Sequence, residues 1–488
     1  MEIDFNLIPV SLLVPGVFAE IDESKASSGP AVQKYRALIL AQKTTAGSAA
    51  ADVPVGVPNA EDANSLFGEG SMAARMVQKF RGRNLFTELD VIPLDDLVAG
   101  VLATGTFTFV GTATGAGTIF LYIGGDRLRA AVANGDTGTI IATAVVDAIN
   151  AAEGLAITAT SAIATVTFTA RNKGEVGNKI DLRVNHNPGE ALPAGIAVTG
   201  GLMAGGSGNP TLTAAIAAMG ETQYNVIAFP YVDTTSLTDI ETELLDRWGP
   251  LRANDGVAIA AEQDTIGALQ TLGNARNSQF VSILGLDSFP GIPAERAAQA
   301  AGLVAFFGAS DPARPFQTLR LSGLAPAEID RFTIQERNLL LEDGISTLVT
   351  GPGGAIQINR LVTTRTKNDS GFADTAFRDV NDVLQLGFYR FSWAKRMRLR
   401  FPRHKLAEEI SGVFDGGQDI LTPMGAKTES IAHYGELEAL GIVQDPRFFA
   451  DNTKFEIGAA DPNRLNGVLA PRLTGQARVI AGKVQFRE

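Results

Sequence analysis

Apolar and polar positions along the chain predict an α/β region that is interrupted by an insertion. Short, continuous apolar runs predict strands buried on both faces, and apolar residues spaced by three and four predict helices between them. The predicted strands are 37–41, 88–93, 224–231, 256–261 and 280–286, and the predicted helices are 64–80, 237–252, 265–275 and 294–307. Helices of this length between such strands predict a mainly parallel sheet covered on both faces.

The pattern changes between residues 100 and 208, where Gly, Thr and Ala dominate and charged residues are few. Alternating or β-branched segments predict strands at 106–110, 118–123, 156–160 and 165–169, with one helix at 139–152. Glycine-rich linkers at 200–201 and 205–208 close the segment. We therefore predict an inserted, protruding β-rich module whose low charge is compatible with packing in an assembly.

The chain beyond residue 328 differs again. We predict a helix to about 343, a hairpin over 345–364 that turns at 351–354, a long helix at 374–400 and a helix near 428–440. The predicted fold class is α/β and α+β multidomain: a mainly parallel sheet core with an inserted β-rich module, a C-terminal α+β domain and extended terminal β-arms. The predicted divisions are an N-terminal arm 1–22, an α/β region in two parts 23–99 and 209–327, the inserted module 100–208, the C-terminal domain 328–470 and a C-terminal arm 471–488.

Both ends of the chain resemble β-strands that have no obvious partner within the protein. Pro15 disfavours a helix near the N-terminus, and near the C-terminus apolar residues alternate with Lys483 and Gln485. Apolar strands at free termini invite pairing with another chain. We predict inter-subunit contacts for the apolar arm residues Val14, Val17, Phe18, Ile21, Val479, Ile480, Val484 and Phe486.

Composition narrows the classes of function. With 45% hydrophobic and 19% charged residues the chain has a globular composition, and no apolar run reaches the roughly 18 residues that a bilayer span needs. Acidic Glu2 and Asp4 argue against a secretory signal. The absence of Cys excludes thiolate metal sites and disulfides, and three scattered His residues make a metal cluster improbable. A net charge of -12 disfavours nucleic acid as a partner of the whole chain.

The usual catalytic signatures are missing. Residues 425–428 resemble a phosphate loop only superficially, because the Gly-Lys-Thr order is absent. His404 lies among cations with no adjacent carboxylate, which favours a positional role over general-base catalysis. Asp126 and Asp136 could form a carboxylate pair, but both stand beside glycines that favour turns. We predict no enzyme activity and no cofactor.

One basic stretch is unusual in an acidic chain. It runs without an acid from the end of the predicted helix at 374–400 into the next segment, and its cations are Arg390, Lys395, Arg396, Arg398, Arg400, Arg403 and Lys405. Two or three cations would satisfy the helix dipole, whose effect is confined to the last turn. We favour a docking surface for an acidic partner, with a solvated helix end or a nucleic-acid contact as alternatives.

Several blocks of residues, in this order, resemble contractile-tail sheath proteins of the Mu-like bacteriophage type over nearly the whole chain. They are Val14-Pro15-Gly16-Val17, Glu20-Ile21-Asp22, residues 169–178, residues 224–231, residues 401–407, Leu421-Thr422-Pro423 and residues 461–465. The resemblance implies subunits that stack as hexameric rings around a tail tube, linked by exchanged terminal arms that complete a sheet in the C-terminal domain of a neighbour. It also implies contraction without nucleotide, which drives the tube through the host envelope.

The resemblance further implies which partners the subunit has and where it works. The partners are other copies of the chain, the tail tube protein, the baseplate and the tail terminator, with no direct nucleic-acid contact and no transmembrane segment. The location is the virion tail, assembled in the host bacterial cytoplasm. The C-terminal domain would face the tube through Arg390, Lys395, Arg396, Arg398 and Arg400. The module 100–208 is a variable part of such proteins, so its role is the one that the resemblance to the family indicates least. The alternatives are another phage shell protein, such as a capsid subunit, or a ligand-binding α/β protein.

Overall fold

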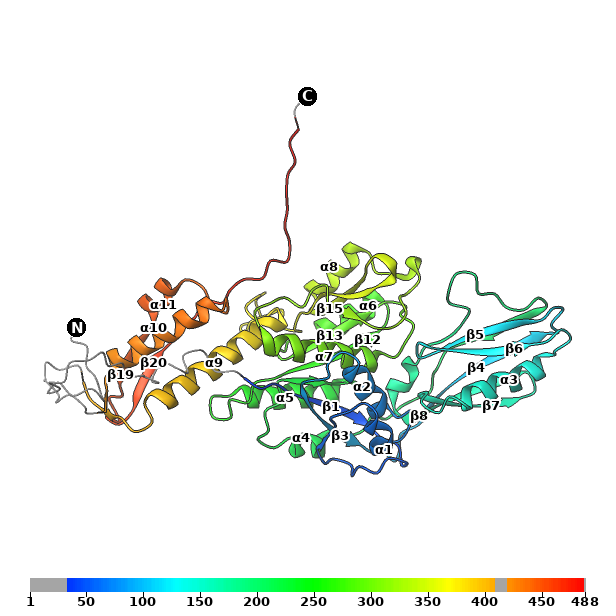
Figure 1. The fold of residues 1–488 in the computed structure, drawn as a ribbon, viewed down its shortest axis with the longest axis horizontal. Coiled ribbons are helices and arrows are strands. Elements are labelled where there is room, and N and C mark those ends of the chain that lie inside the picture. Colours follow the sequence, from blue (N-terminus) through cyan, green and yellow to red (C-terminus); the bar gives the residue numbers. More distant parts are fainter. Residues whose placement is uncertain (1–32, 409–418, 487–488) are drawn as a thin grey trace, which may run out of the picture. The chain divides into compact units, whose positions relative to one another are not determined.

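The computed structural model describes residues 33–408 and 419–486 (Figure 1). By its internal contacts the described chain forms two compact units: residues 34–388 with 475–486, and residues 389–408 with 419–474. The predicted N-terminal arm, including Val14, Val17, Phe18 and Ile21, lies outside the described residues. No helix in the described ranges combines the length and apolarity needed to cross a membrane.

The larger unit is built on a mixed nine-stranded sheet within the described residues. In spatial order the strands are β14 (Arg320–Leu321), β16 (Ile356–Arg360), β15 (Ile345–Thr350), β13 (Val281–Leu286), β12 (Val257–Gln263), β11 (Val226–Ala228), β1 (Arg36–Gln42), β3 (Glu88–Leu94) and β2 (Val55–Gly56). The strands from β15 through β3 are parallel, and antiparallel pairs stand only at the two edges. β13 is buried along its whole length and β1 at every residue after Arg36, as their continuous apolar runs predict.

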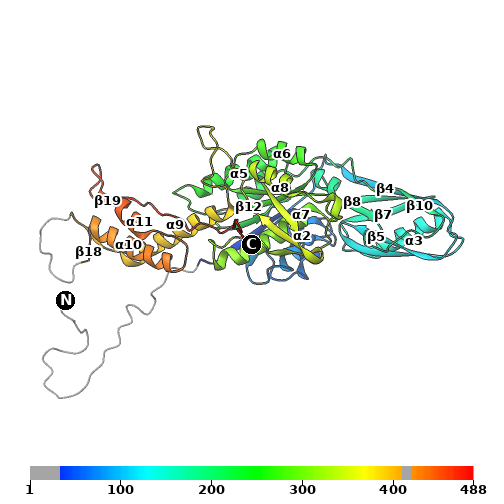
Figure 2. The ribbon, with the colours of Figure 1, turned by 90° about the horizontal axis from the view of Figure 1, so that it is seen from above.

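Helices cover both faces of this sheet (Figure 2). They are α1 (Asp62–Phe67), α2 (Met72–Arg81), α4 (Thr213–Ala218), α5 (Thr234–Trp248), α6 (Ile266–Asn274), α7 (Pro293–Ser310) and α8 (Ile334–Glu342). Helices α2 and α7 pack on each other and on β1, while α6 packs on α8 and β15. The predicted helix at 64–80 is in fact two helices, because Gly68 and Gly70 adopt positive φ angles and Ser71 caps α2.

The chain between β3 and β11 forms two smaller antiparallel sheets of its own. Their strands are β10 (Ile196–Gly200), β4 (Leu102–Gly111), β8 (Thr165–Lys173) and β7 (Ile157–Ala162) in one sheet, and β6 (Asp126–Val132), β5 (Gly117–Ile123) and β9 (Leu182–Val184) in the other. Helix α3 (Gly138–Asn150) contacts strands of both sheets, and Phe107 and Phe168 meet edge to face at 5.2 Å in the core. The sequence pattern did not predict β6, β9 or β10; in β6, Arg127 and Arg129 break the apolar pattern.

The second unit consists of helices and short strand pairs. Its elements are the end of α9 (Val380–Arg400), β17 (Lys405–Leu406), β18 (Ile420–Leu421), α10 (Pro423–Ala439), α11 (Pro446–Asn452), β19 (Lys454–Ile457) and β20 (Leu465–Val468). Tyr434 of α10 stacks on Phe449 of α11 with ring centroids 3.9 Å apart, and Tyr389 packs on both. These aromatic contacts form the centre of the unit's core.

The division between the units differs from the predicted boundary at residue 328. It falls within α9, between Phe388 and Tyr389. The hairpin of β15 and β16 was predicted correctly, with its turn at 352–354, but it extends the large sheet because β15 pairs in parallel with β13. Hydrogen bonding to β13 thus places residues 328–388 with the α/β unit. The long helix α9 also begins at Val380, six residues later than predicted.

Candidate assembly surfaces

The C-terminal segment is extended and exposes a row of apolar side chains. Val479, Ile480, Val484 and Phe486 are 87%, 93%, 91% and 82% exposed, respectively. Residues 475–486 form no β-ladder with the rest of the described chain. Large apolar side chains grouped in one exposed segment are typical of a surface that another chain covers. All four are residues for which the sequence predicts inter-subunit contacts.

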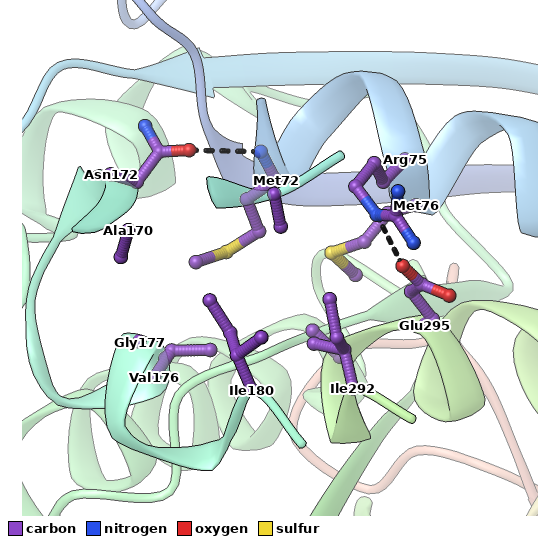
Figure 3. Close-up of a pocket in the computed structure, with 12 residues that line it drawn as sticks. Met72, Arg75, Met76, Ala170, Asn172, Val176, Gly177, Ile180, Ile292 and Glu295 are labelled. Atoms are coloured by element: carbon purple, nitrogen blue, oxygen red, sulfur yellow. Dashed lines mark hydrogen bonds and ion pairs between the residues drawn. The ribbon is translucent and has the colours of Figure 1, made fainter. Parts of the chain in front are cut away.

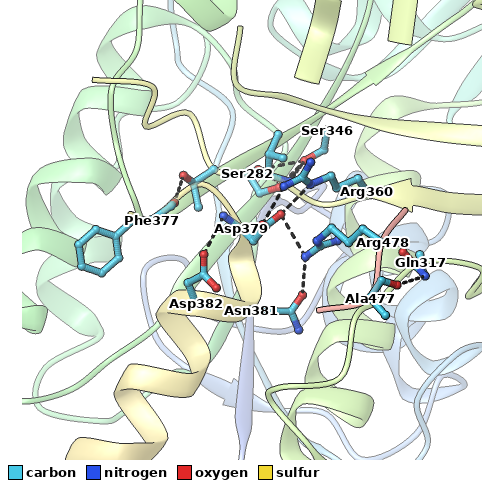
Figure 4. Close-up of polar contacts among 12 residues, drawn as sticks. Ser282, Gln317, Ser346, Arg360, Phe377, Asp379, Asn381, Asp382, Ala477 and Arg478 are labelled. Atoms are coloured by element: carbon cyan, nitrogen blue, oxygen red, sulfur yellow. Dashed lines mark hydrogen bonds and ion pairs between the residues drawn. The ribbon is translucent and has the colours of Figure 1, made fainter. Parts of the chain in front are cut away.

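An ion cluster fixes the start of this exposed segment (Figure 4). Arg478 donates to Asp379 at 3.1 Å, and Arg360 binds the same carboxylate through Nε and Nη2 at 2.9 Å each. The side chains of Arg478 and Asp379 are only 12% and 13% exposed. Gln317 Nε2 donates to the carbonyl of Ala477 at 3.2 Å. Burial and the charge of Asp379 raise the pKa of the neighbouring Asp382 to about 6.

The freely exposed part is therefore shorter than the predicted arm 471–488. Arg472 binds Asp445 at 2.7 Å, and its carbonyl accepts from the backbone of Gln444. Tyr434 Oη also donates to the carbonyl of Arg472 at 3.2 Å. Residues 471–474 thus pack in the second unit, residues 477–478 form the root of the arm, and the exposed segment begins at Val479.

A two-stranded hairpin in the second unit offers open sheet edges. β19 and β20 pair antiparallel from Lys454 opposite Val468 to Ile457 opposite Leu465. Within the described residues no further strand pairs with either of them. A lone two-stranded sheet is marginal in water, and its unpaired edges are templates for a strand from another chain. Helix α10 packs beside β19.

The basic end of α9 divides into a paired side and an exposed side. Arg396 binds Glu429 at 2.6 Å and Glu436 at 3.2 Å, and Arg400 lies 3.6 Å from Glu429. Lys395 and Arg398 are exposed and, being three residues apart on the helix, lie on one face. Arg390 is half-buried, and burial lowers the pKa of its guanidinium.

The acids that bind this stretch were not predicted from the sequence. Glu429 and Glu436 stand on α10, more than 30 residues downstream of Arg396, and their spacing of seven places them on one helix face. The spacing was the one sign in the sequence that this face of α10 is acidic. It does not identify the cations that Glu429 and Glu436 bind, because the pairing depends on how α10 packs against α9.

Two of the histidines have packing roles in this unit. His433 is buried and its Nε2 lies 3.1 Å from Ser392 Oγ. Burial and the charge of Arg396 lower the pKa of His433 to about 4, so its ring is neutral at physiological pH. His404 packs edge to face with Phe401 at 5.1 Å.

The carboxyl ends of β11 and β12 open into a cleft of about 440 Å³, the place where parallel sheets commonly bind ligands. Lys179, contributed by the inserted segment, binds Glu262 at 2.6 Å and Asp264 at 3.1 Å there. Burial raises the pKa of Glu262, and Lys179 opposes that shift. The chain's own lysine therefore pairs with two of the four acidic residues that line the cleft, the other two being Glu175 and Asp233. In the described ranges no group of three His, Cys, Asp or Glu residues is placed to hold a metal ion.

A buried arginine joins the inserted segment to the α/β core. Arg75 of α2 donates to Glu295 of α7 at 2.5 Å (Figure 3), and it also donates to Asp126 of β6 and to the carbonyl of Gly154 at 2.7 Å each. The adjacent cavity of about 30 Å³ is lined mostly by apolar side chains, including Met72 and Ile180. Asp136, the other residue of the candidate carboxylate pair, accepts a hydrogen bond from the backbone N–H of Ala133 in a turn. Asp126 and Asp136 therefore bind different structural partners.

Comparison with known proteins identifies the family. Residues 205–364 match the family model of the phage tail sheath protein central domain. The chain is 38% identical over 486 residues to the Mu-like prophage FluMu tail sheath protein of Haemophilus influenzae, covering 100% of both. Its fold is similar to the PVC sheath complex of an extracellular contractile injection system in the contracted state (TM-score 0.50, 10% identity, covering 98% of this chain and 99% of that one). A sheath tail protein from Desulfitobacterium hafniense gives a TM-score of 0.48 at 13% identity, covering 94% and 100%.

The identity to the FluMu protein extends over the full length of both chains, and the central domain matches the family model. Both findings confirm the resemblance that the ordered sequence blocks indicate. The chain belongs to the phage tail sheath family, a family of structural proteins of contractile tails.

Proposed function

We propose that this protein polymerises as stacked hexameric rings around a tail tube and contracts without nucleotide, driving the tube through the host envelope. The observation that carries the proposal is the C-terminal segment 479–486, which exposes four large apolar side chains beyond a fixed root. Such a segment suits donation to the open edge of the β19–β20 hairpin in another copy. The N-terminal arm 1–22, through Val14, Val17, Phe18 and Ile21, would pair in the same way.

The energetics of one arm are close to balance. Ordering eight residues costs ~1 to 2 kcal/mol each, or about 12 kcal/mol in all. About six added backbone hydrogen bonds at ~1 kcal/mol each return about 6 kcal/mol. Burial of four apolar side chains at ~1.5 to 3 kcal/mol each returns about 9 kcal/mol. A net gain of about 3 kcal/mol per arm is weak alone, but it accumulates when several arms bind within one lattice.

The second unit would face the tube through the exposed side of α9. Lys395 and Arg398 present their charges to solvent, whereas Arg396 is bound to two glutamates. We therefore place the tube contact chiefly on Lys395 and Arg398, with Arg400 and the half-buried Arg390 beside them. The module 100–208 would protrude from the assembled sheath. The other partners would be baseplate and tail terminator, with assembly in the host bacterial cytoplasm and the sheath in the virion tail.

Deletion of residues 479–488 tests the proposal. The variant should keep the thermal stability of the intact monomer, because residues 479–486 lie in solvent, and it should form no cylinders in negative-stain electron microscopy. A matched control, Lys483→Gln, changes a polar position in the same segment and should assemble normally. A second variant lacking residues 1–22 should also fail to assemble. Cylinders of normal appearance from both deletion variants would refute arm exchange.

A further inference from the structure

The loop between α2 and β3 exposes two adjacent large apolar residues. Leu85 and Phe86 are 71% and 81% exposed. They follow the amphipathic helix α2 and precede β3, so neither element requires them for its own packing. Isolated exposed apolar residues are ordinary, but a neighbouring Leu-Phe pair at a loop tip forms a continuous apolar surface.

The backbone of this loop is fixed by a fully buried asparagine. Asn84 Oδ1 accepts from the backbone N–H groups of Phe86 and Thr87 at 3.1 and 3.0 Å. Its Nδ2 donates to Thr87 Oγ1 at 2.7 Å and to the carbonyl of Gly302 in α7 at 3.0 Å. Buried Arg81 donates to the carbonyls of Asn84 and Thr87 at 3.2 and 2.9 Å. The loop is therefore ordered before any partner arrives, which lowers the entropic cost of binding.

The surroundings of the pair have the layout of a protein interface. The ring of Phe86 lies 6.0 Å from that of Phe306, which contacts Phe307 at 5.1 Å. Beside the aromatic centre, Glu88 is bound by Arg36 at 2.8 Å and lies 3.6 Å from Lys34. An aromatic anchor on a supported surface with a charged rim is the arrangement in which binding energy concentrates.

We propose that Leu85 and Phe86 form an assembly knob that packs against a second copy of this chain in the sheath. The inference rests on the proposed function, since membership of the tail sheath family supplies the second copy. Helical polymers grow through contacts between different surfaces of identical subunits, so a fixed projection on one subunit meets another surface of the next. The knob lies on the α/β core, so it adds a contact that does not depend on the arms.

The test combines Leu85→Ser and Phe86→Ser in one double variant of the full chain and compares this variant with the intact protein. The melting temperature should match that of the intact protein, because both side chains are solvent-exposed, and the critical concentration for cylinder formation should rise at least about 10-fold. Leu251→Ser is the matched control: Leu251 is 99% exposed in the same unit and should leave assembly unchanged. An unchanged critical concentration in the double variant overturns the proposal.

A photo-crosslinking amino acid at position 86 identifies the occupant in assembled cylinders. A crosslink to another copy of this chain, mapped by mass spectrometry, supports the proposal. A crosslink within the same subunit, for example to residues 1–32, or to a different protein overturns it. If the arm deletions abolish cylinders while the knob variant assembles normally, the knob fails and the proposed function stands. If the arm deletions also assemble normally, the proposed function fails as well.

Discussion

Replacement of Arg478 by methionine should loosen the root of the C-terminal arm without unfolding the α/β unit. Met keeps much of the apolar stem of Arg but removes the guanidinium that binds Asp379 at 3.1 Å. Asp379 retains its two bonds from Arg360, so the carboxylate does not become an unpaired buried charge. The larger penalty expected for breaking an isolated buried ion pair therefore does not apply.

The size of the effect follows chiefly from the lost bond to Asp379, since the second contact of Arg478, with Asn381 Oδ1, is longer at 3.5 Å. A hydrogen bond to a charged group contributes ~1.5 to 3 kcal/mol, so the substitution should cost the closed root about 2 kcal/mol. That corresponds to a roughly 30-fold rise in the fraction of molecules whose arm has left its root, since ~1.4 kcal/mol is a factor of ten. The bond from Gln317 to Ala477 would remain and would limit the opening.

Spin labels can measure this opening because the chain contains no Cys. Gly482→Cys places one label on the arm, where a Cβ meets no atom within 4 Å, and Asp369→Cys places the other on the core, where its side chain is 96% exposed. The electron–electron distance distribution should be broader with Arg478→Met than without it, and Lys483→Met should leave it unchanged. Equal widths with and without Arg478 would refute the anchoring role of the ion cluster.

Two further predictions concern the second unit. Charge reversal of Lys395 and Arg398 should weaken co-sedimentation with tail tubes but leave the assembly of empty sheath unchanged. Arg396→Glu should instead lower the melting temperature, because it breaks the ion pairs with Glu429 and Glu436. Unchanged tube binding by the variant with Lys395 and Arg398 reversed would contradict the tube-facing assignment. The pKa of His433 falls from 6.5 to about 4 on folding, so the unfolded chain binds a proton more readily than the folded one between these pH values. The neutral ring therefore contributes at most about 3 kcal/mol to the free energy of unfolding, which is fully present above pH 6.5 and is lost as the pH falls toward 4. His433→Gln should therefore flatten the dependence of urea-unfolding midpoints on pH in that window, and parallel pH profiles would contradict it.

The architecture of the core could be predicted because its strands are buried on both faces. Continuous apolar runs such as that of β13 leave few alternatives, and the intervening helices show clear spacing. β6 was missed because its exposed face carries arginines, and the predicted helix at 64–80 ignored the conformational freedom of Gly68 and Gly70. These are local errors, since the correct information was present within a few residues of each.

The polar contacts that organise the candidate surfaces could not be predicted in the same way. Arg396 and Glu429 are 33 residues apart, and Arg478 and Asp379 are separated by a whole structural unit along the sequence. Each pair forms only because tertiary packing brings two elements together. From the sequence alone, every cation at the end of α9 is therefore expected to be available to a partner, although in the structure Arg396 already binds two acids.

The C-terminal arm and the knob, two exposed apolar surfaces of the larger unit, are organised in the same way. In the arm, Arg478 binds a carboxylate within the chain, and the apolar side chains beyond it point into solvent. In the knob, Arg81 and Asn84 fix the backbone, and Leu85 and Phe86 project beyond it. Polar groups set the direction of each surface, and apolar groups supply the energy for contact. Substitutions at the fixed base should therefore alter the geometry of assembly, while substitutions at the apolar tip should alter its affinity and leave the monomer intact.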